Sequence, residues 1–275
     1  MNTIHYKWHI DQSATRQLLI TGNVGADDFP KIIHAGDRAL LVDFLPTIGL
    51  PAAAPPRAFD PARHARVLAL DAAITRNEVA GVVECIVAYA SLLVCYDPLA
   101  TTPEELTATL RTLLGEQAGA DPRRRTWRVP VCYGGSHGPD LAEVAARCGL
   151  SSDDVIELHA SARYTVAMFG FLPGFAYLAG LPDHLAVPRR ATPRTRVPEG
   201  GIGIGGAQTA IGSVAGPSGW HQIGRTPVRT FAPSRQPVTF LDIGDEIRFV
   251  AIDSTRFARL AAAAEHGDLV AEIIT

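Results

Sequence analysis

Cysteine is scarce in this chain, and its few occurrences are not arranged for metal binding or cross-linking. The 275 residues include four cysteines, and no two of them form a CxxC pair. Metal sites built on cysteine and disulfide frameworks need closer or more numerous thiols. The nine histidines also lack the spacing of ligands on one helix, so the sequence predicts no metal site and reduced, mostly buried thiols.

Long apolar runs and a large net charge are also missing. No stretch approaches the roughly 20 apolar residues of a membrane span, and the first residues lack the apolar core of a signal peptide. The formal net charge is only −3, which gives no overall attraction for nucleic acid or anionic lipid. We therefore expect a cytoplasmic protein with neither nucleic acid nor a membrane as its partner.

The pattern of elements predicts two domains, as expected for a chain of this length with 47% hydrophobic residues. Residues 1–30 have no clear period and are read as an extension, and the Pro/Ala-rich segment around 46–58 is read as a long loop. Residues 31–132 form the first predicted domain, 133–160 a helical connector, and 161–275 a second, β-rich domain with a closing helix.

The first domain shows alternating β and α signals. Strands are predicted at 39–44, at two adjoining runs within 79–96, and at 126–132. A helix begins after the N-cap Asp60 with Pro61 in its first turn. A second helix begins at the capping box Thr102 to Glu105, and Gly115 would end it. The order β, α, β, β, α, β is that of a ferredoxin-like split βαβ fold, so the chain is predicted to be of the α+β class.

The connector contains two short helices separated by Gly149, with a capping box at Ser151 and Asp154. This pattern also fits a DNA-binding helix-turn-helix, but Asp153, Asp154 and Glu157 would repel phosphates on the second helix. Beyond residue 163, short strands between Pro/Gly turns are typical of a compact barrel or sandwich. These strands are predicted at 164–169, 228–231, 238–241 and 246–252, and a closing helix at 256–265.

Glycines crowd residues 200–206, where Gly201, Gly203 and Gly206 formally satisfy GxGxxG. A dinucleotide fingerprint needs a following helix, and the next residues are too rich in Gly, Ser and Pro to form one. No GK[ST] follows, which excludes a P-loop. The segment is predicted to be a strand and turn that lies close to a ligand or to a neighbouring strand.

Arginines gather at Arg189, Arg190, Arg194 and Arg196 among several prolines, and Arg225 is a further candidate. Prolines restrict the backbone, and arginine forms paired hydrogen bonds with carboxylates or phosphates. Arg190, Arg194, Arg196 and Arg225 are therefore predicted to bind an anionic substrate, with a surface or interface role as the alternative.

Other candidate site residues surround this cluster. Phe171, Pro173, Phe175 and Tyr177 are predicted to form an apolar pocket wall, with a core-filling loop as the alternative. Gln208 and Thr209 could bind an amide, and Trp220 could close over it. His159 is the candidate general acid or base, although a lone histidine is more often structural. No Ser-His-Asp or Cys-His arrangement can be assembled.

Four consecutive blocks resemble the family of the 5-oxoprolinase B subunit, which is also called the KipI or allophanate hydrolase subunit 1 family. The blocks are YGGSHGPDLAEVA at 133–145, FGFLPGFAYLAGLP at 169–182, PRRATPRTRVPEGGIGIGGAQTA at 188–210 and GPSGWHQIGRTP at 216–227. The resemblance implies an N-terminal α+β domain followed by a cyclophilin-like β-barrel. After Gln208 and Thr209 the chain reads Ala-Ile-Gly-Ser, which departs from the family pattern by removing an aromatic residue.

The resemblance also implies a function. It predicts a subunit of an ATP-dependent hydrolase that cleaves 5-oxoproline to glutamate, inactive without a KipA-type protein as the C subunit and a LamB/YcsF-type third component. ATP would be a co-substrate of the complex, with no tightly bound cofactor. The alternatives are a carboxyltransferase-like component of a urea or allophanate pathway and a KipI-like inhibitor of a sensor histidine kinase.

Overall fold

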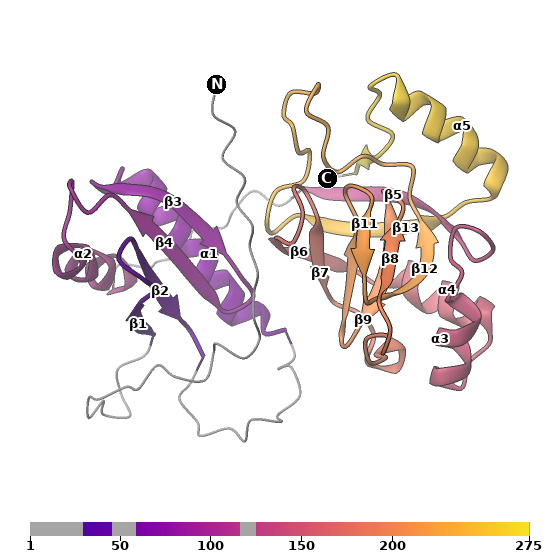
Figure 1. The fold of residues 1–275 in the computed structure, drawn as a ribbon, viewed down its shortest axis with the longest axis horizontal. Helices are drawn as coiled ribbons and strands as arrows, with labels where there is room; N and C mark the ends of the chain where they lie inside the picture. Colours follow the sequence, from indigo (N-terminus) through magenta and orange to yellow (C-terminus); the bar gives the residue numbers. More distant parts are fainter. Residues whose placement is uncertain (1–29, 46–58, 116–124, 275) are drawn as a thin grey trace.

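The protein consists of an α+β unit followed by a closed β-barrel (Figure 1). A computed structural model describes residues 30–45, 59–115 and 125–274. Residues 1–29 of the predicted N-terminal extension and all of the Pro/Ala-rich loop at 46–58 lie outside the described residues. The fold confirms the predicted succession of an α+β unit and a barrel.

The first unit is a four-stranded antiparallel sheet with two helices packed on it. Its strand order is β1-β2-β4-β3, where the strands are β1 (Lys31–His34), β2 (Ala39–Asp43), β3 (Val82–Val87) and β4 (Ser91–Tyr96). The helices are α1 (Pro61–Arg76) and α2 (Pro103–Gly115). Their predicted starts are confirmed, because the Asp60 side chain accepts a hydrogen bond from the Arg63 amide and Thr102 and Glu105 form a reciprocal cap.

Alternation along the central strands builds the first core. In β4 every second side chain is buried, and Leu92 and Val94 are fully enclosed. The apolar faces of α1 and α2 meet these side chains through residues such as Leu70 and Leu110, both 0% exposed. Apolar side chains recur at every second residue of the strands and at every third or fourth residue of the helices. These side chains therefore meet in one buried layer between the sheet and the helices.

One predicted strand belongs to a different sheet. The segment predicted at 126–132 forms β5 (Thr126–Tyr133), which pairs with strands of the barrel and not with the first sheet. The remaining strand of the first sheet is β1, a hairpin partner of β2. Alternating apolar residues show that a strand has a buried face, but they do not show which neighbour it pairs with, and this is why the assignment was wrong.

Seven strands close the barrel in the order β12-β9-β10-β7-β6-β13-β5, with β5 pairing back to β12. β5 and β13 run parallel, and the remaining ring pairs are antiparallel. The new strands are β6 (Tyr164–Phe169), β7 (Ala176–Ala179), β9 (Gly201–Gly205), β10 (Gln208–Ile211), β12 (His221–Arg225) and β13 (Glu246–Ala251). β14 (Glu272–Ile273) extends the sheet beside β5.

Helices and a short ribbon surround the barrel. α3 (Leu141–Cys148) packs on β12 and α4 (Ser152–Ser161) packs on β13, and the predicted capping box at Ser151 and Asp154 is present. α5 (Ser254–Glu265) is the predicted closing helix. The remaining elements are a 3-10 turn at Asp183–Leu185 and a two-stranded ribbon of β8 (Arg194–Val197) and β11 (Gly216–Ser218).

Two predicted strands are absent from the described barrel. Residues 228–231 and 238–241 are irregular and share a single bridge between Phe231 and Thr239. Their apolar side chains are still used, since Val228, Phe240 and Leu241 are buried in the barrel core. Apolar composition therefore correctly predicted burial but not a regular backbone. Among the described residues, no helix is long and apolar enough to cross a membrane.

The first core provides a simple stability test. Leu110→Ala removes a fully buried side chain from α2, and we expect it to lower the free energy of unfolding by about 2–5 kcal/mol. Thr109→Ala on the exposed face of the same helix should change it by less than about 0.5 kcal/mol. Urea unfolding followed by circular dichroism measures both. Equal effects would contradict the assigned packing of α2.

Candidate binding cleft

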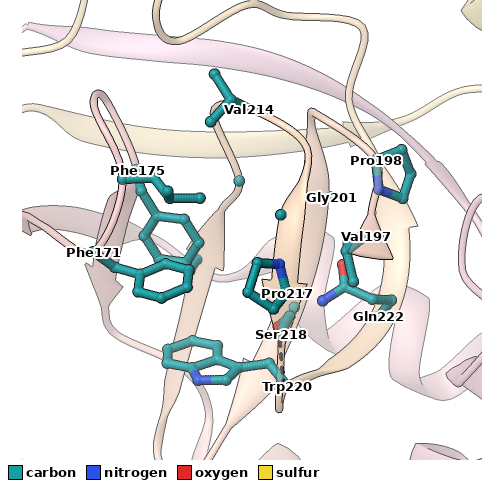
Figure 2. Close-up of a pocket in the computed structure, with 15 residues that line it drawn as sticks. Phe171, Phe175, Val197, Pro198, Gly201, Val214, Pro217, Ser218, Trp220 and Gln222 are labelled. Atoms are coloured by element: carbon teal, nitrogen blue, oxygen red, sulfur yellow. Dashed lines mark hydrogen bonds between the residues drawn. The ribbon is translucent and has the colours of Figure 1, made fainter. Parts of the chain in front are cut away.

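An open cleft lies on the outer face of the barrel, over β9 and β10. It encloses about 340 Å³ including its mouth. Figure 2 shows Phe171 and Phe175 on one side, Val197 and Gln222 on the other, and Trp220 below them. The β8–β11 ribbon contributes to the cleft through residues including Val197, Pro217 and Ser218.

Alternate glycines of β9 form the floor of the cleft. Ile202 and Ile204 point into the barrel core and are 0% exposed, so the intervening glycines face outward. A Cβ on Gly203 would stand 2.8 Å from the Gln222 amide nitrogen, and one on Gly205 would stand 2.7 Å from the Trp220 ring. The glycine-rich segment is thus a strand, as predicted. It lacks side chains on this face so that Trp220 and Gln222 can lie against it.

Aromatic side chains form one wall. The ring centroids of Phe171 and Phe175 are 5.6 Å apart, and the Tyr177 ring lies 4.9 Å from Phe175 and 5.8 Å from Trp220. Phe171 and Phe175 line the cleft. Tyr177 supports the wall from behind, whereas Pro173 is exposed on the same loop and does not line the cleft.

Asp140 is a buried carboxylate that the sequence reasoning missed, and it forms ion pairs with two of the predicted arginines. Its side chain is 3% exposed. Arg194 forms a paired contact with it, at 2.5 Å from Nη1 to Oδ2 and 2.6 Å from Nη2 to Oδ1. Arg190 Nη1 donates to Oδ1 at 3.0 Å. Asp140 lies within the sequence block at 133–145, which was the available signal for it.

The same carboxylate fixes strand β12. The Gln222 backbone N–H donates to Asp140 Oδ2 at 2.7 Å, and the Asp140 backbone N–H donates to the Gln222 carbonyl at 2.9 Å. Burial raises the pKa of Asp140, but the hydrogen bonds from Arg194 and Gln222 and the charges of Arg194 and Arg190 outweigh it, so that its pKa lies below the usual value. The carboxylate is therefore ionised at neutral pH.

The structure does not bring the five candidate arginines to one anion site. Arg190 and Arg194 are engaged with Asp140, and Arg190 also reaches Glu143 at 3.3 Å. Arg225 donates to the Glu199 carbonyl at 2.8 Å and lies over the Phe257 ring. Arg189 lies over the Trp220 ring, 5.5 Å from its centroid. Arg196 is exposed on β8 and does not line the cleft.

The two polar residues predicted on β10 point in opposite directions. Thr209 is 0% exposed and faces the barrel interior, where its hydroxyl donates to the Gly203 carbonyl at 3.0 Å. Gln208 faces outward and lies beside the Tyr89 phenol of the first unit. Neither of them lines the cleft. Neighbouring side chains of a strand point to opposite faces, so Gln208 and Thr209 cannot act on one ligand together. The prediction that treated them as a pair did not take this alternation into account.

His159 is enclosed in the barrel core. Its Nε2 lies 3.1 Å from Thr209 Oγ1 and its Nδ1 lies 2.8 Å from the Tyr133 hydroxyl. Because the Thr209 proton is already donated to Gly203, Nε2 carries the imidazole hydrogen and Nδ1 accepts from Tyr133. Burial lowers the pKa of His159 to about 3. A neutral histidine with both nitrogens satisfied and no exposed surface has no access to a substrate, so its placement argues against the predicted acid–base role.

The described residues that line the cleft include no acid–base pair. The lining has no carboxylate, histidine, lysine or arginine, and its one hydroxyl, on Ser218, accepts a hydrogen bond from the Trp220 amide. The described residues also contain no group of His, Cys, Asp and Glu that could hold a metal ion. The cleft thus has the chemistry of a binding surface.

Comparisons with known proteins agree on one family. Residues 30–241 match the model of the carboxyltransferase domain, subdomain C and D. The chain is 50% identical over 135 residues to the B subunit of 5-oxoprolinase from Escherichia coli O157:H7, covering 49% of this chain and 62% of that protein. It is 39% identical over 197 residues to the B subunit of 5-oxoprolinase from Bacillus subtilis, covering 68% of this chain and 82% of the relative. The match therefore spans less than two thirds of the Escherichia coli protein.

Solved structures share the fold. The crystal structure of TTHA0988 matches with a TM-score of 0.67 and 31% identity, over 79% of this chain and 40% of that one. The urea amidolyase of Kluyveromyces lactis matches with a TM-score of 0.72 over 88% of this chain and 16% of that one. At 19% identity the second match shows a common fold alone.

The buried histidine predicts acid sensitivity. In the unfolded chain His159 becomes protonated below the usual histidine pKa of 6.5. In the folded protein it stays neutral down to about pH 3. The stability contributed by the neutral ring is therefore complete above pH 6.5 and falls below it. In His159→Gln this contribution to the pH slope, about 1.4 kcal/mol per pH unit, should disappear. Urea unfolding between pH 7 and pH 4 measures the free energy of unfolding of both proteins. If this free energy has the same pH dependence in wild type and in His159→Gln, His159 is not a buried neutral histidine.

The Asp140 contacts predict a large loss in Asp140→Asn. The change leaves Arg190 and Arg194 without their shared anion, and we expect it to lower the free energy of unfolding at pH 7 by about 3 kcal/mol. Because the pKa of Asp140 is lowered, the wild-type advantage should persist down to its usual value of 3.8 and vanish as pH falls further. The control is Glu143→Gln, an exposed partner of Arg147 and Arg190, which should cost under about 1 kcal/mol.

Proposed function

Because the chain belongs to the carboxyltransferase domain family of subdomains C and D, we propose that it works as the B subunit of a 5-oxoprolinase, which opens 5-oxoproline to glutamate. The similarity to two proteins that carry this name supports the proposal. The observation that carries it is the cleft on β9 and β10, which is small, largely apolar and floored by glycine. A five-membered lactam is compact and flat, and such walls suit its ring.

The proposed reaction needs partners. The cleft offers binding groups but no general base or activated nucleophile among its described lining residues. We therefore propose that the chain is inactive alone and that a KipA-type protein, as the C subunit, and a LamB/YcsF-type component supply the reacting groups. In this division the chain would bind and orient the lactam, which lowers the entropic cost of the reaction.

ATP is proposed as a co-substrate of the complex. A lactam carbonyl resists water, and transfer of a phosphoryl group to its oxygen would create a better leaving group before hydrolysis. In this chain the glycine-rich segment is followed by β10 and not by a helix, so it lacks the helix N-terminus of a phosphate-binding loop. Its described residues in this segment therefore supply no phosphate-binding loop for the phosphoryl transfer.

A cytoplasmic location is proposed on the state of the thiols. Cys85, Cys95, Cys132 and Cys148 are all free. Burial is the largest cause that raises the pKa of each thiol, to about 12 for Cys85, which keeps it protonated and unreactive. Free, inert thiols suit a reducing compartment.

The proposal predicts glutamate formation from 5-oxoproline and ATP only when this chain is mixed with its two partner components. Trp220→Ala removes the lower wall of the cleft, and we expect kcat/KM of the mixture to fall at least about tenfold. The control Thr195→Ala changes an exposed side chain on β8 and should leave it unchanged. Glutamate is measured by coupled assay. Turnover that continues without this chain would refute the proposal, and turnover of urea in place of 5-oxoproline would favour the carboxyltransferase-like alternative.

A further inference from the structure

The Gln222 side chain places a buried amide oxygen without a hydrogen-bond partner in the candidate cleft. The residue is 6% exposed and lines the cleft on the side opposite Phe171 (Figure 2). Its Oε1 makes no hydrogen bond with any described residue. A buried acceptor without a partner is unfavourable, and native proteins seldom keep one unless another molecule satisfies it.

The backbone that carries this amide is firmly held. Both backbone groups of Gln222 hydrogen-bond to Asp140, which is itself fixed by Arg194 and Arg190. The side chain lies against β9, where the absence of a Cβ on Gly201 and Gly203 makes room for Oε1 and Nε2 respectively. The amide is thus positioned by its surroundings although its Oε1 is left without a hydrogen bond, which is the arrangement expected of a recognition group.

We propose that the Gln222 carboxamide recognises the amide edge of the substrate, and that the ligand class is a cis amide such as a lactam. A side-chain carboxamide presents an N–H donor and a C=O acceptor side by side. A small lactam presents its own C=O and N–H on one edge, so the two edges form a pair of reciprocal hydrogen bonds. Chain peptides are trans and place these groups on opposite edges, so they cannot form the pair. This inference rests on the proposed function and names the substrate contact within it.

Access to Oε1 involves the β8–β11 ribbon. Val197 lies next to Oε1 over Gly201, which shields the oxygen from water. The ribbon is a separate two-stranded sheet, with no ladder to the described barrel strands. Opening the acceptor therefore requires a movement of the Val197 side chain alone, which leaves the barrel ladders and the contact between Asp140 and Arg194 in place.

Ligand selectivity tests the pairing directly. The ring-oxygen analogue of 5-oxoproline keeps the shape and the carbonyl but replaces the N–H by an acceptor that faces Oε1. We expect the complex of wild-type chain and partners to bind 5-oxoproline at least about tenfold more tightly than this lactone, because a site built for a donor rejects an analogue without one. Competition binding by calorimetry measures the ratio, and equal affinities would overturn the proposal without any variant.

The variant test uses Gln222→Met, which keeps the length of the side chain but removes both hydrogen-bonding groups. The preference for lactam over lactone should disappear, whereas Gln236→Met, an exposed glutamine outside the cleft, should retain it. Thermal melting confirms that both variants are folded. A folded Gln222→Met protein that keeps the full lactam preference would refute the role of Gln222.

The two proposals fail in different ways. If the wild-type complex produces no glutamate but still prefers 2-pyrrolidone to γ-butyrolactone through Gln222, the amide recognition stands and the oxoprolinase function is wrong. If glutamate forms and the preference is independent of Gln222, the function stands and the recognition group is elsewhere.

Discussion

The buried carboxylate of Asp140 joins the three segments on which the cleft depends. It follows the turn after β5, binds Arg194 on β8 through two contacts, and holds the backbone of Gln222 on β12. Removal of a carboxylate from water is costly, and here that cost is offset by two guanidinium groups and a backbone N–H. Since these partners come from separate parts of the chain, one ionised group fixes the ribbon and the barrel wall relative to each other.

The strand β9 serves the core and the cleft at once. Its isoleucines fill the barrel because they alternate with glycines, and the same alternation removes side chains from the outer face. A Cβ at Gly205 would meet the Trp220 ring at 2.7 Å. The cleft is therefore a product of strand periodicity, with no need for a long loop to shape it.

Local signals predicted local structure well, because the interactions behind them lie within a few residues of one another. The caps at Asp60, Thr102 and Ser151 each join groups three residues apart, and all three are present. The partner of β5 could not be predicted, since alternation specifies a face and not a neighbour. The prediction of a substrate site from the arginine run was limited for the same reason. The run indicated a capacity to bind anions, but the anion that Arg190 and Arg194 contact is a carboxylate of the chain itself, about fifty residues earlier in sequence.

The described lining of the cleft has polar groups that can bind a ligand but no titratable group that could react with it. Asp140 and His159 are not free to react: Asp140 is paired with arginines, and His159 is enclosed in the barrel. What the described lining retains is mainly apolar surface and one unpartnered amide oxygen, Gln222 Oε1. Such a surface binds substrate and transition state to a similar extent, so it accelerates a reaction mainly by fixing the position of the reacting carbonyl. On the proposed function, the Gln222 N–H is the one side-chain amide donor of the described lining for the charge that develops on that carbonyl, so the remaining stabilisation must come from groups of a partner.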